Sequence, residues 1–421
     1  MKASAGSNLR ILWVKAGKLL PLDTGGKIRS FNILRHLARR HQVTLLSYYG
    51  GKKDPDYEAE ITGELPGTHA IATSALDGDA VAQSVDYLWR LWQPEPFAVS
   101  KFTDPAVRRT LAAWLGAEKF DVAVCDFLSA SLNFPRTSAT PVVLFQHNVE
   151  TALWQRMAST ESNPLKRLVY RIEAVKMARY EQHTLHRFRQ VIAVSEHDRQ
   201  EMLAVAADCD IVVVPTGVDT QKYSAAPPAA ANPPRIVFTG SMDWEPNLDA
   251  VAYFCRDIFP RVRRESPAAI FQIVGRNPHP SVRAVASDHV QVTGTVPSVA
   301  DYLRDATVVI VPLRIAGGTR LKIFEAMAMG KAVVSTSIGA EGLDVQNGRD
   351  LILADDPAAF AEAILLLIRN EGLRQNYERS AAKLAAQYDW SIIVDRFAAV
   401  LLKASQSDSS GRKLAGVPVQ S

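Results

Sequence analysis

Short apolar runs alternate with stretches of helical periodicity along nearly the whole chain. The first run, Arg10–Val14, precedes a segment whose apolar residues Ile28, Phe31, Leu34 and Leu37 fall on one helical face. Several later runs are apolar on both faces, which is typical of central strands in parallel sheets covered by helices. The further strands that we expect in this half of the chain are 43–47, 122–125, 142–145, 191–194 and 211–214.

A second strand–helix series begins after a Pro/Ala-rich segment at 224–234, which has little capacity for helix or sheet interior. Its expected strands are 235–239, 269–274, 289–292, 307–311 and 332–335. The pattern therefore predicts an α/β protein of two doubly wound, Rossmann-like domains. We place them at 1–221 and 222–387, with a C-terminal helix (388–404) packing back on the first domain and a disordered tail at 405–421.

Composition narrows the class of protein. The chain has 421 residues, of which 47% are hydrophobic and 22% charged, with a net charge of +4. This is the composition of a packed globular protein, and such a mild charge demands no nucleic-acid partner. Cys125, Cys209 and Cys255 lie far apart, so we expect core thiols rather than a disulfide or zinc framework. No apolar stretch approaches the roughly 18 residues that cross a bilayer, and we expect a cytoplasmic protein.

Ligands of doubly wound sheets bind outside the carboxyl ends of the strands, so we expect binding residues in the loops that follow strands. After the strand ending at Val311 come Gly317 and Gly318, and Thr319 is placed to cap a helix. A helix start, with Arg320 and Lys322 beside it, suits a phosphate group. Glu325 is the single acid of this apolar helix; it either binds sugar hydroxyls or forms a structural ion pair with Arg320 or Lys322.

Other strand exits carry weaker candidates. Glu341 lies between glycines after the strand 332–335, where it either approaches a ligand or is a plain loop residue. His147 follows the strand 142–145 and either contacts a substrate, with Asn148 and Glu150 orienting it, or is a core histidine. Gly25 and Gly26 form the first strand-to-helix turn, which touches ligand only if the loop closes on it.

The run GGTRLKIFEAMAMGKAVVSTSIGAEGL (317–343) resembles the donor-binding region of the retaining GT-B glycosyltransferases of family 4. The resemblance extends through VPTGVD (214–219), FTGSMDWEPN (238–247) and IVGRNP (273–278), and through TGGKIRSFNILRHLARRHQVTLLS at the front. Among members of the family, the chain most resembles sugar transferases of bacterial exopolysaccharide loci.

The resemblance implies a GT-B fold of two facing domains with a cleft between them. It also implies that Glu325 binds the nucleotide ribose and that His147 lies near the transferring sugar, so these two are the expected catalytic residues. The family's first motif acid falls on Gly317, so the N–H groups of Gly318 and Thr319 are expected to substitute. The segment SMDWEPN lacks the usual cations, and the diphosphate is assigned to Arg320, Lys322 and the N–H groups around Gly240 and Ser241.

The implied function is transfer of a hexose, with retention, from a nucleoside-diphosphate sugar to a glycan or lipid-linked acceptor in cell-surface polysaccharide synthesis. We expect no cofactor and no metal ion, since no Asp-x-Asp motif lies in a plausible strand-end loop. A non-catalytic sugar-nucleotide scaffold and a nucleotide-sugar epimerase remain alternatives. An oxidoreductase is disfavoured because no GxGxxG follows an early strand.

A basic stretch at 151–190 has two interpretations. Arg167, Arg171, Lys176 and Arg179 recur at helical spacing. Such faces are usually solvated helix surface, but here they could also receive a lipid-linked acceptor or contact the inner membrane surface.

Overall fold

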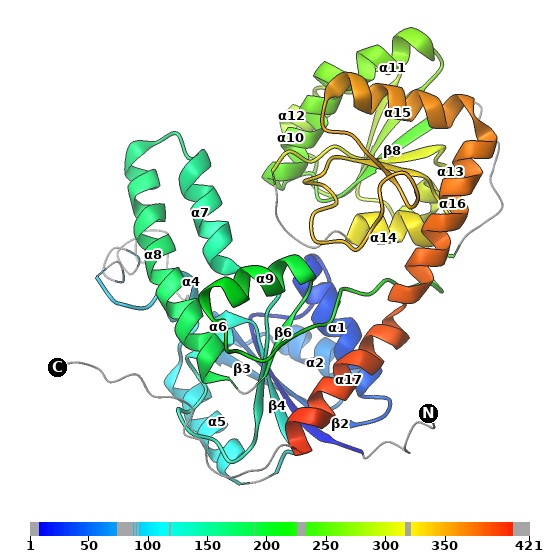
Figure 1. Ribbon diagram of the computed structural model, residues 1–421. Helices are drawn as coiled ribbons and strands as arrows, with labels where there is room; N and C mark the ends of the chain where they lie inside the picture. Colours follow the sequence, from blue (N-terminus) through cyan, green and yellow to red (C-terminus); the bar gives the residue numbers. More distant parts are fainter. Residues whose placement is uncertain are drawn as a thin grey trace. The chain divides into compact units, whose positions relative to one another are not determined.

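The structure, a computed structural model, describes residues 8–73, 87, 90, 92–117, 119–188, 190–224, 233–315 and 321–406. It divides the chain into two compact units, Thr216–Ile393 and the remainder (Met1–Pro215 with Val394–Ser421). Each contains one parallel sheet (Figure 1). The two doubly wound α/β domains expected from the alternating pattern are therefore confirmed. The expected disordered tail at 405–421 lies almost wholly outside the described residues.

The first unit has a seven-stranded sheet in the order β3-β2-β1-β4-β5-β6-β7. Its strands are β1 (Arg10–Ala16), β2 (Gln42–Gly50), β3 (Thr68–Thr73), β4 (Val122–Asp126), β5 (Val142–Phe145), β6 (Gln190–Ala193) and β7 (Ile211–Val213). Its helices are α1 (Gly25–Leu37), α2 (Pro55–Glu64), α4 (Phe97–Ser100), α5 (Pro105–Gly116), α6 (Leu128–Ser131), α7 (Glu150–Thr160), α8 (Pro164–Arg187) and α9 (Glu196–Val205).

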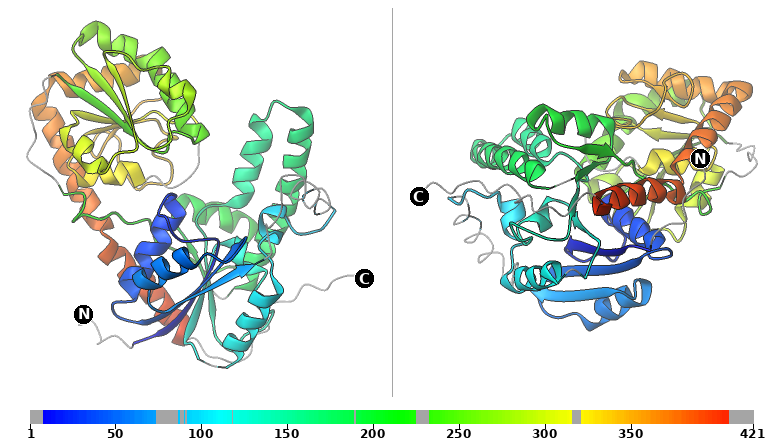
Figure 2. Two further views of the ribbon diagram at one scale, coloured as in Figure 1. Left: turned by 180° about the vertical axis from the view of Figure 1, so that it is seen from behind. Right: turned by 60° about the horizontal axis from the view of Figure 1, so that its bottom comes forward.

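Apolar side chains on both faces of this sheet explain why helices cover both sides. On one face Leu12, Val14 and Leu144 pack against α5, α6, α8 and α9. On the other, Trp13 and Phe145 hold Phe397, a residue of α17 (Trp390–Gln406), with ring centroids 5.5 and 5.1 Å away. The part of α17 from Val394 onward thus belongs to the first unit, as Figures 1 and 2 show in red.

The second unit has a six-stranded sheet in the order β10-β9-β8-β11-β12-β13. Its strands are β8 (Arg235–Thr239), β9 (Ile270–Val274), β10 (Val290–Gly294), β11 (Val308–Val311), β12 (Val333–Ser335) and β13 (Ile352–Leu353). Its helices are α10 (Glu245–Tyr253), the π-helix Phe254–Ile258, α11 (Phe259–Glu265), α12 (Pro280–Arg283), α13 (Val299–Asp305), α14 (Leu321–Ala328), α15 (Pro357–Arg369), α16 (Glu371–Ala385) and the 3-10 turn Ala386–Tyr388.

The two units divide after Pro215, a few residues before the boundary expected at 221/222. The reason is local pairing within the second unit. Val218 exchanges backbone hydrogen bonds with Tyr388 and Trp390, and the Thr220 hydroxyl donates to Asp389. Gly217 lies so close to Trp390 that a Cβ there would be 2.5 Å from the indole ring. Residues 216–220 are thus held by the segment that precedes α17.

Candidate active site

Both sheets reverse their strand order at one point, between β1 and β4 in the first unit and between β8 and β11 in the second. The loops leaving these neighbouring strands diverge to opposite faces, which opens a crevice at the carboxyl edge. Each unit thus has one such edge.

A buried polar cluster lies at the switch point of the first sheet. Asp126, the last residue of β4, is 1% exposed and accepts hydrogen bonds from the Trp13 indole (2.9 Å) and the Lys15 ammonium (3.0 Å). His147, two residues after β5, places Nε2 at 2.7 Å from the other carboxylate oxygen. The cluster gathers charged and aromatic side chains from β1, from β4 and from the loop that follows β5.

Burial and the charges of this cluster together set the protonation state of His147. Burial alone would raise the pKa of Asp126, but the charge of Lys15 and the hydrogen bond from His147 hold it below its ordinary value. Burial lowers the pKa of His147 to about 4, although Asp126 opposes that shift. At neutral pH the carboxylate is ionised and the imidazole neutral. Because a carboxylate only accepts, the proton resides on Nε2 and Nδ1 is a hydrogen-bond acceptor.

The side of this imidazole that carries Nδ1 faces the first turn of α1. Thr24 caps that helix by accepting from the Lys27 N–H, and a Cβ on Gly26 would lie 3.2 Å from His147 Nδ1. The structure thus brings the expected residues Gly26 and His147 together, with Gly25 beside them as the first residue of α1. Glycine at position 26 leaves room at the acceptor nitrogen.

Gly26→Ala should separate activity from stability. The methyl group would crowd Nδ1, and we expect kcat/KM for transfer to fall about tenfold or more. Alanine favours helix over glycine by at most roughly 1 kcal/mol, which offsets part of the cost of this crowding, so the melting temperature should change by only a few degrees. Steady-state kinetics and thermal unfolding test this, with Gly63→Ala in α2 as control because a Cβ there meets nothing within 4 Å. Unchanged kinetics in Gly26→Ala would contradict a functional Nδ1.

The loop after β5 is held by a buried acid of α8. Glu181, 1% exposed, accepts from the Gln146 side-chain amide (3.0 Å) and from the N–H groups of Glu150 and Thr151 (3.1 and 3.0 Å). The Asn148 amide donates to Glu150 Oε1 at 2.9 Å. The expectation that Asn148 and Glu150 orient His147 is therefore wrong: these two pair with each other, and Asp126 orients the imidazole.

Glu150 should make stability depend on pH. Burial, reinforced by the charge of Glu181, raises its pKa from 4.5 to about 7. A raised carboxyl pKa lowers stability progressively as pH rises from about 4.5 to 7, because only the unfolded chain ionises freely. We expect Glu150→Gln to raise the free energy of unfolding by about 2–3 kcal/mol at pH 8 and by little at pH 4.5.

Urea titrations at pH 8 and 4.5 measure this difference. Glu64→Gln, at an exposed position at the end of α2, serves as control and should change stability by less than about 0.5 kcal/mol at either pH. A Glu150→Gln effect equal at both pH values would mean that the carboxyl titrates normally.

In the second unit the carboxyl end of β8 is closely packed. A Cβ on Gly240 would lie 2.6 Å from Asn247 Nδ2 and 3.1 Å from Lys322 Nζ, and one on Gly275 would lie 1.6 Å from the Gly240 carbonyl oxygen. The Gly240 N–H donates to Val274 O at 3.0 Å. The assignment of a diphosphate to the Gly240 N–H is therefore wrong, because this N–H already donates a hydrogen bond to the neighbouring strand β9.

Lys322 places a cation near the segment SMDWEPN, which has none of its own. Its Nζ donates to Asn247 Oδ1 at 2.9 Å and lies 4.3 Å from the Phe238 ring centroid. Asn247 is itself fixed by donating to the Ser241 carbonyl at 2.8 Å. An ammonium from α14 is thus held over the end of β8.

Two neighbours of this cluster were not expected from the sequence. Arg276, after β9, donates through Nε to the Ser241 hydroxyl at 2.9 Å. Tyr223 hydrogen-bonds Glu325. Burial raises the pKa of Glu325 above its ordinary value, although the hydrogen bond from Tyr223 and the charges of Lys222 and Lys322 oppose this shift. The only hints in the sequence were an arginine at a strand exit (IVGRNP) and a tyrosine before the linker.

The remaining expected residues are less informative. Glu341 lies partly exposed in the turn after β12, where the Gly339 N–H donates to the Thr336 hydroxyl. Gly317, Gly318, Thr319 and Arg320 lie outside the described residues.

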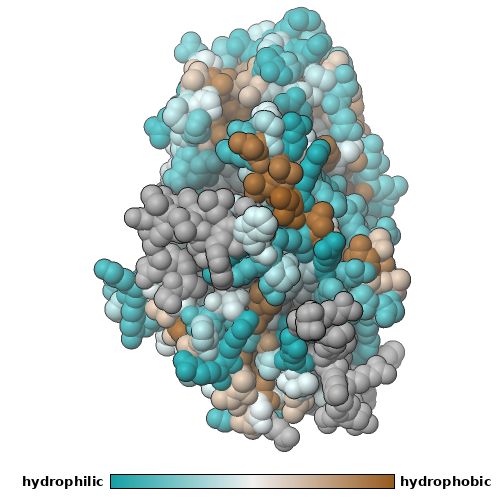
Figure 3. All heavy atoms as spheres, turned by 90° about the vertical axis from the view of Figure 1, so that its left-hand side faces the viewer, coloured by the Kyte–Doolittle hydropathy of each residue, from teal (hydrophilic) through white to brown (hydrophobic). Residues whose placement is uncertain are grey.

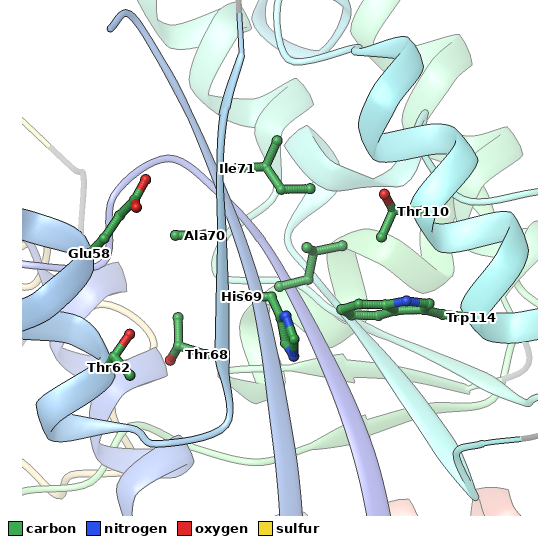
Figure 4. A pocket seen from close by; sticks show the side chains of 9 residues that line it. Glu58, Thr62, Thr68, His69, Ala70, Ile71, Thr110 and Trp114 are labelled. Carbon is green, nitrogen blue, oxygen red and sulfur yellow. The ribbon is translucent and has the colours of Figure 1, made fainter. Parts of the chain in front are cut away.

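Two other features lie away from these edges. His186, Asp208 and Cys209 bring metal-ligating atoms within 4.8 Å of one another, but they precede β6 and β7 and so lie at the amino edge of the sheet. A hollow of about 320 Å³ beside the edge strand β3, between α2 and α5 (Figure 4), contains none of the candidate residues. Its lining is Leu46, Glu58, Thr62, Thr68, His69, Ala70, Ile71, Thr110 and Trp114.

Comparison with known proteins decides the family. Residues 24–222 match the model of "Glycosyltransferase Family 4" and residues 233–370 that of "Glycosyl transferases group 1". The chain belongs to glycosyltransferase family 4, also described as group 1. The two matches together cover both units.

Individual relatives are more distant. The chain is 30% identical over 228 residues to a phosphatidyl-myo-inositol mannosyltransferase of Mycobacterium leprae, a match covering 52% of this chain and 60% of that protein. It is 22% identical over 285 residues to an uncharacterized 44.6 kDa protein in the cps region of Klebsiella pneumoniae, covering 65% and 72%. Because the match spans only 60% of the mannosyltransferase, the activity of that protein is not assigned to this chain.

Solved glycosyltransferase structures share the fold of this family 4 chain. Anabaena Alr3699/HepE in complex with UDP-glucose superposes with a TM-score of 0.61 at 16% identity, covering 94% of this chain and 100% of that one. At this identity the likeness shows the GT-B fold of two Rossmann-like domains, in agreement with the expected fold class.

Proposed function

We propose that the protein is a retaining glycosyltransferase that moves a hexose from a nucleoside-diphosphate sugar to a glycan or lipid-linked acceptor in cell-surface polysaccharide synthesis. In this proposal it works in the cytoplasm, in peripheral contact with the inner membrane surface, and needs no metal ion or cofactor. A UDP-glucose complex among structures of the same fold and a cps-region relative support the donor class and the pathway.

The observation that carries the proposal is the placement of Lys322 and Glu325 on α14. Residues three apart lie on the same helical face, and the charge of Lys322 acts on the Glu325 carboxyl. An ammonium matches a diphosphate, and a half-buried carboxylate matches the hydroxyls of a ribose. A cation and an acid on one face of this helix fit a nucleoside diphosphate.

Chemically, the bond between the anomeric carbon and the phosphate oxygen breaks, and the leaving diphosphate gains negative charge. Lys322 stabilises that charge. The acceptor hydroxyl bonds to the anomeric carbon, and its proton passes to the departing phosphate oxygen, so no protein nucleophile is required. In the first unit, the Nδ1 of His147 accepts a hydrogen bond from a hydroxyl of the transferring sugar, and Asp126 keeps that nitrogen unprotonated.

A transfer assay with EDTA tests the proposal. The purified chain is incubated with labelled UDP- and GDP-sugars and with lipid extracts or short glycans as acceptors. We expect release of nucleoside diphosphate together with a labelled product. Conversion of the donor to its epimer would instead indicate an epimerase, and binding without release of diphosphate with any acceptor would indicate a scaffold.

A further inference from the structure

Helix α8 carries a row of exposed apolar side chains on one face. Leu165, Leu168, Ile172 and Val175 are 75%, 56%, 40% and 53% exposed. At about 100° per residue these four positions fall within roughly 80° of one another. They are four of the twelve large hydrophobic side chains that are exposed in the described part of the chain, so the row is a cluster rather than chance scatter.

This row is not the face with which α8 packs on its own unit. The buried residues of the helix, among them Glu173, Met177 and Glu181, lie on the opposite side. Tyr170 packs against Trp154 of α7, with ring centroids 5.9 Å apart. The inner face is thus packed within its own unit, whereas the side chains of the outer row remain 40–75% exposed among the described residues. Figure 3 shows hydrophobic atoms gathered on this side of the molecule, surrounded by hydrophilic ones.

The exposed Lys, Arg, Asp and Glu side chains of α8 itself have a single sign of charge. Helix α8 contains six Lys or Arg residues and two Glu residues, and both glutamates are buried. Arg171 and Arg179 are exposed on or beside the apolar row. The solvent-facing surface of this helix is thus apolar and cationic, the combination that binds anionic lipid headgroups.

Two other occupants fit less well. A second copy docked face to face by a two-fold axis would bring Arg171 and Arg179 against the same cations, which is unfavourable. A membrane-spanning role is excluded by length, because the row covers only about 15 Å of helix. Among the described residues no helix is both long and apolar enough to cross a bilayer.

We propose that the outer face of α8 (Leu165, Leu168, Ile172 and Val175 with Arg171 and Arg179) is a docking surface for an anionic lipid bilayer. The helix lies in the plane of the interface, with the apolar row among the acyl chains and the arginines at the phosphates. The inference rests on the membrane contact in the proposed function and assigns it to named residues.

Vesicle flotation of the full chain tests the assignment. The vesicles are phosphatidylcholine alone or phosphatidylcholine mixed with phosphatidylglycerol. We expect binding to the anionic vesicles only, weakened by added salt. Leu165→Gln with Leu168→Gln should lower the partition coefficient about tenfold or more, and Arg171→Gln with Arg179→Gln should lower it about tenfold. The control pair is Leu366→Gln with Ile392→Gln, at exposed apolar positions outside α8, and it should bind as wild type does.

Other results would overturn the assignment. These are absence of binding to either vesicle, equal binding by the α8 variants, or concentration-dependent dimerisation that the same variants abolish. Stabilisation by a nucleotide sugar is measured on every variant. If a nucleotide sugar stabilises the protein but the vesicles do not bind, the docking surface is refuted and the transferase proposal stands. If no nucleotide sugar stabilises any variant but the vesicles bind, the transferase proposal is refuted and the docking surface stands.

Discussion

His147→Ala should lower kcat for sugar transfer by about 100- to 1,000-fold while leaving donor affinity nearly unchanged. The variant removes the neutral imidazole whose Nδ1 is held as an acceptor by the ionised Asp126. Donor affinity should survive because the nucleotide contacts that we assign lie in the second unit. Steady-state kinetics for kcat and calorimetry for donor binding measure the two effects separately.

His197→Ala is the matched control for this variant. His197 lies on α9 in the same unit with its side chain 45% exposed, in an exposed pair with Glu201 of the kind that contributes little. Its kinetics should equal those of the wild type. If His147→Ala kept more than about a tenth of wild-type kcat, the buried cluster would be a structural feature of the sheet edge rather than part of the catalytic site.

The second large effect is expected on donor binding. Lys322→Ala removes the ammonium that Asn247 holds over the end of β8. A charge-assisted hydrogen bond to phosphate contributes about 1.5–3 kcal/mol, so the donor Kd should rise about 10- to 100-fold. Isothermal calorimetry with the nucleoside diphosphate alone isolates this contact from those made by the sugar.

Lys383→Ala, at an exposed position on α16 in the same unit, controls for the loss of one positive charge. It should leave Kd within about twofold, since the charge of a solvent-exposed side chain is largely screened. An equal loss of affinity in both variants would indicate a general charge effect, and no loss in Lys322→Ala would refute the assigned diphosphate contact.

Much of the fold could be predicted because the strands are continuous apolar runs. The runs in both halves correspond to strands of the two sheets. The edge strand β3 was missed because its residues, THAIAT, are small or polar and mostly half-buried, and β13 has only two residues. Edge strands lack the two buried faces that make a central strand visible in sequence.

Residues of the candidate site could be predicted only where their position relative to a predicted strand or helix start indicated a binding role. His147 stands out as a polar residue at a strand exit, and Lys322 as a cation in the first turn of the helix that follows β11. Their partners could not be foreseen, because Asp126 and Asn247 are brought close by the strand order of the folded sheet. An aspartate closing the buried strand β4 was nonetheless a usable signal, since a buried carboxylate needs partners. The sequence order alone suggested Asn148 and Glu150, which pair with each other.

Ligand-induced thermal stabilisation against a panel of nucleotide sugars, with EDTA present, tests the central claim most directly. The wild-type chain is compared with Glu325→Ala and Lys322→Ala, and with Lys383→Ala as control. We expect one donor class to raise the melting temperature of the wild type and the control, and both α14 variants to lose the effect. If no nucleotide sugar raises the melting temperature of the wild-type chain, the carboxyl edge of the second sheet is not a donor site.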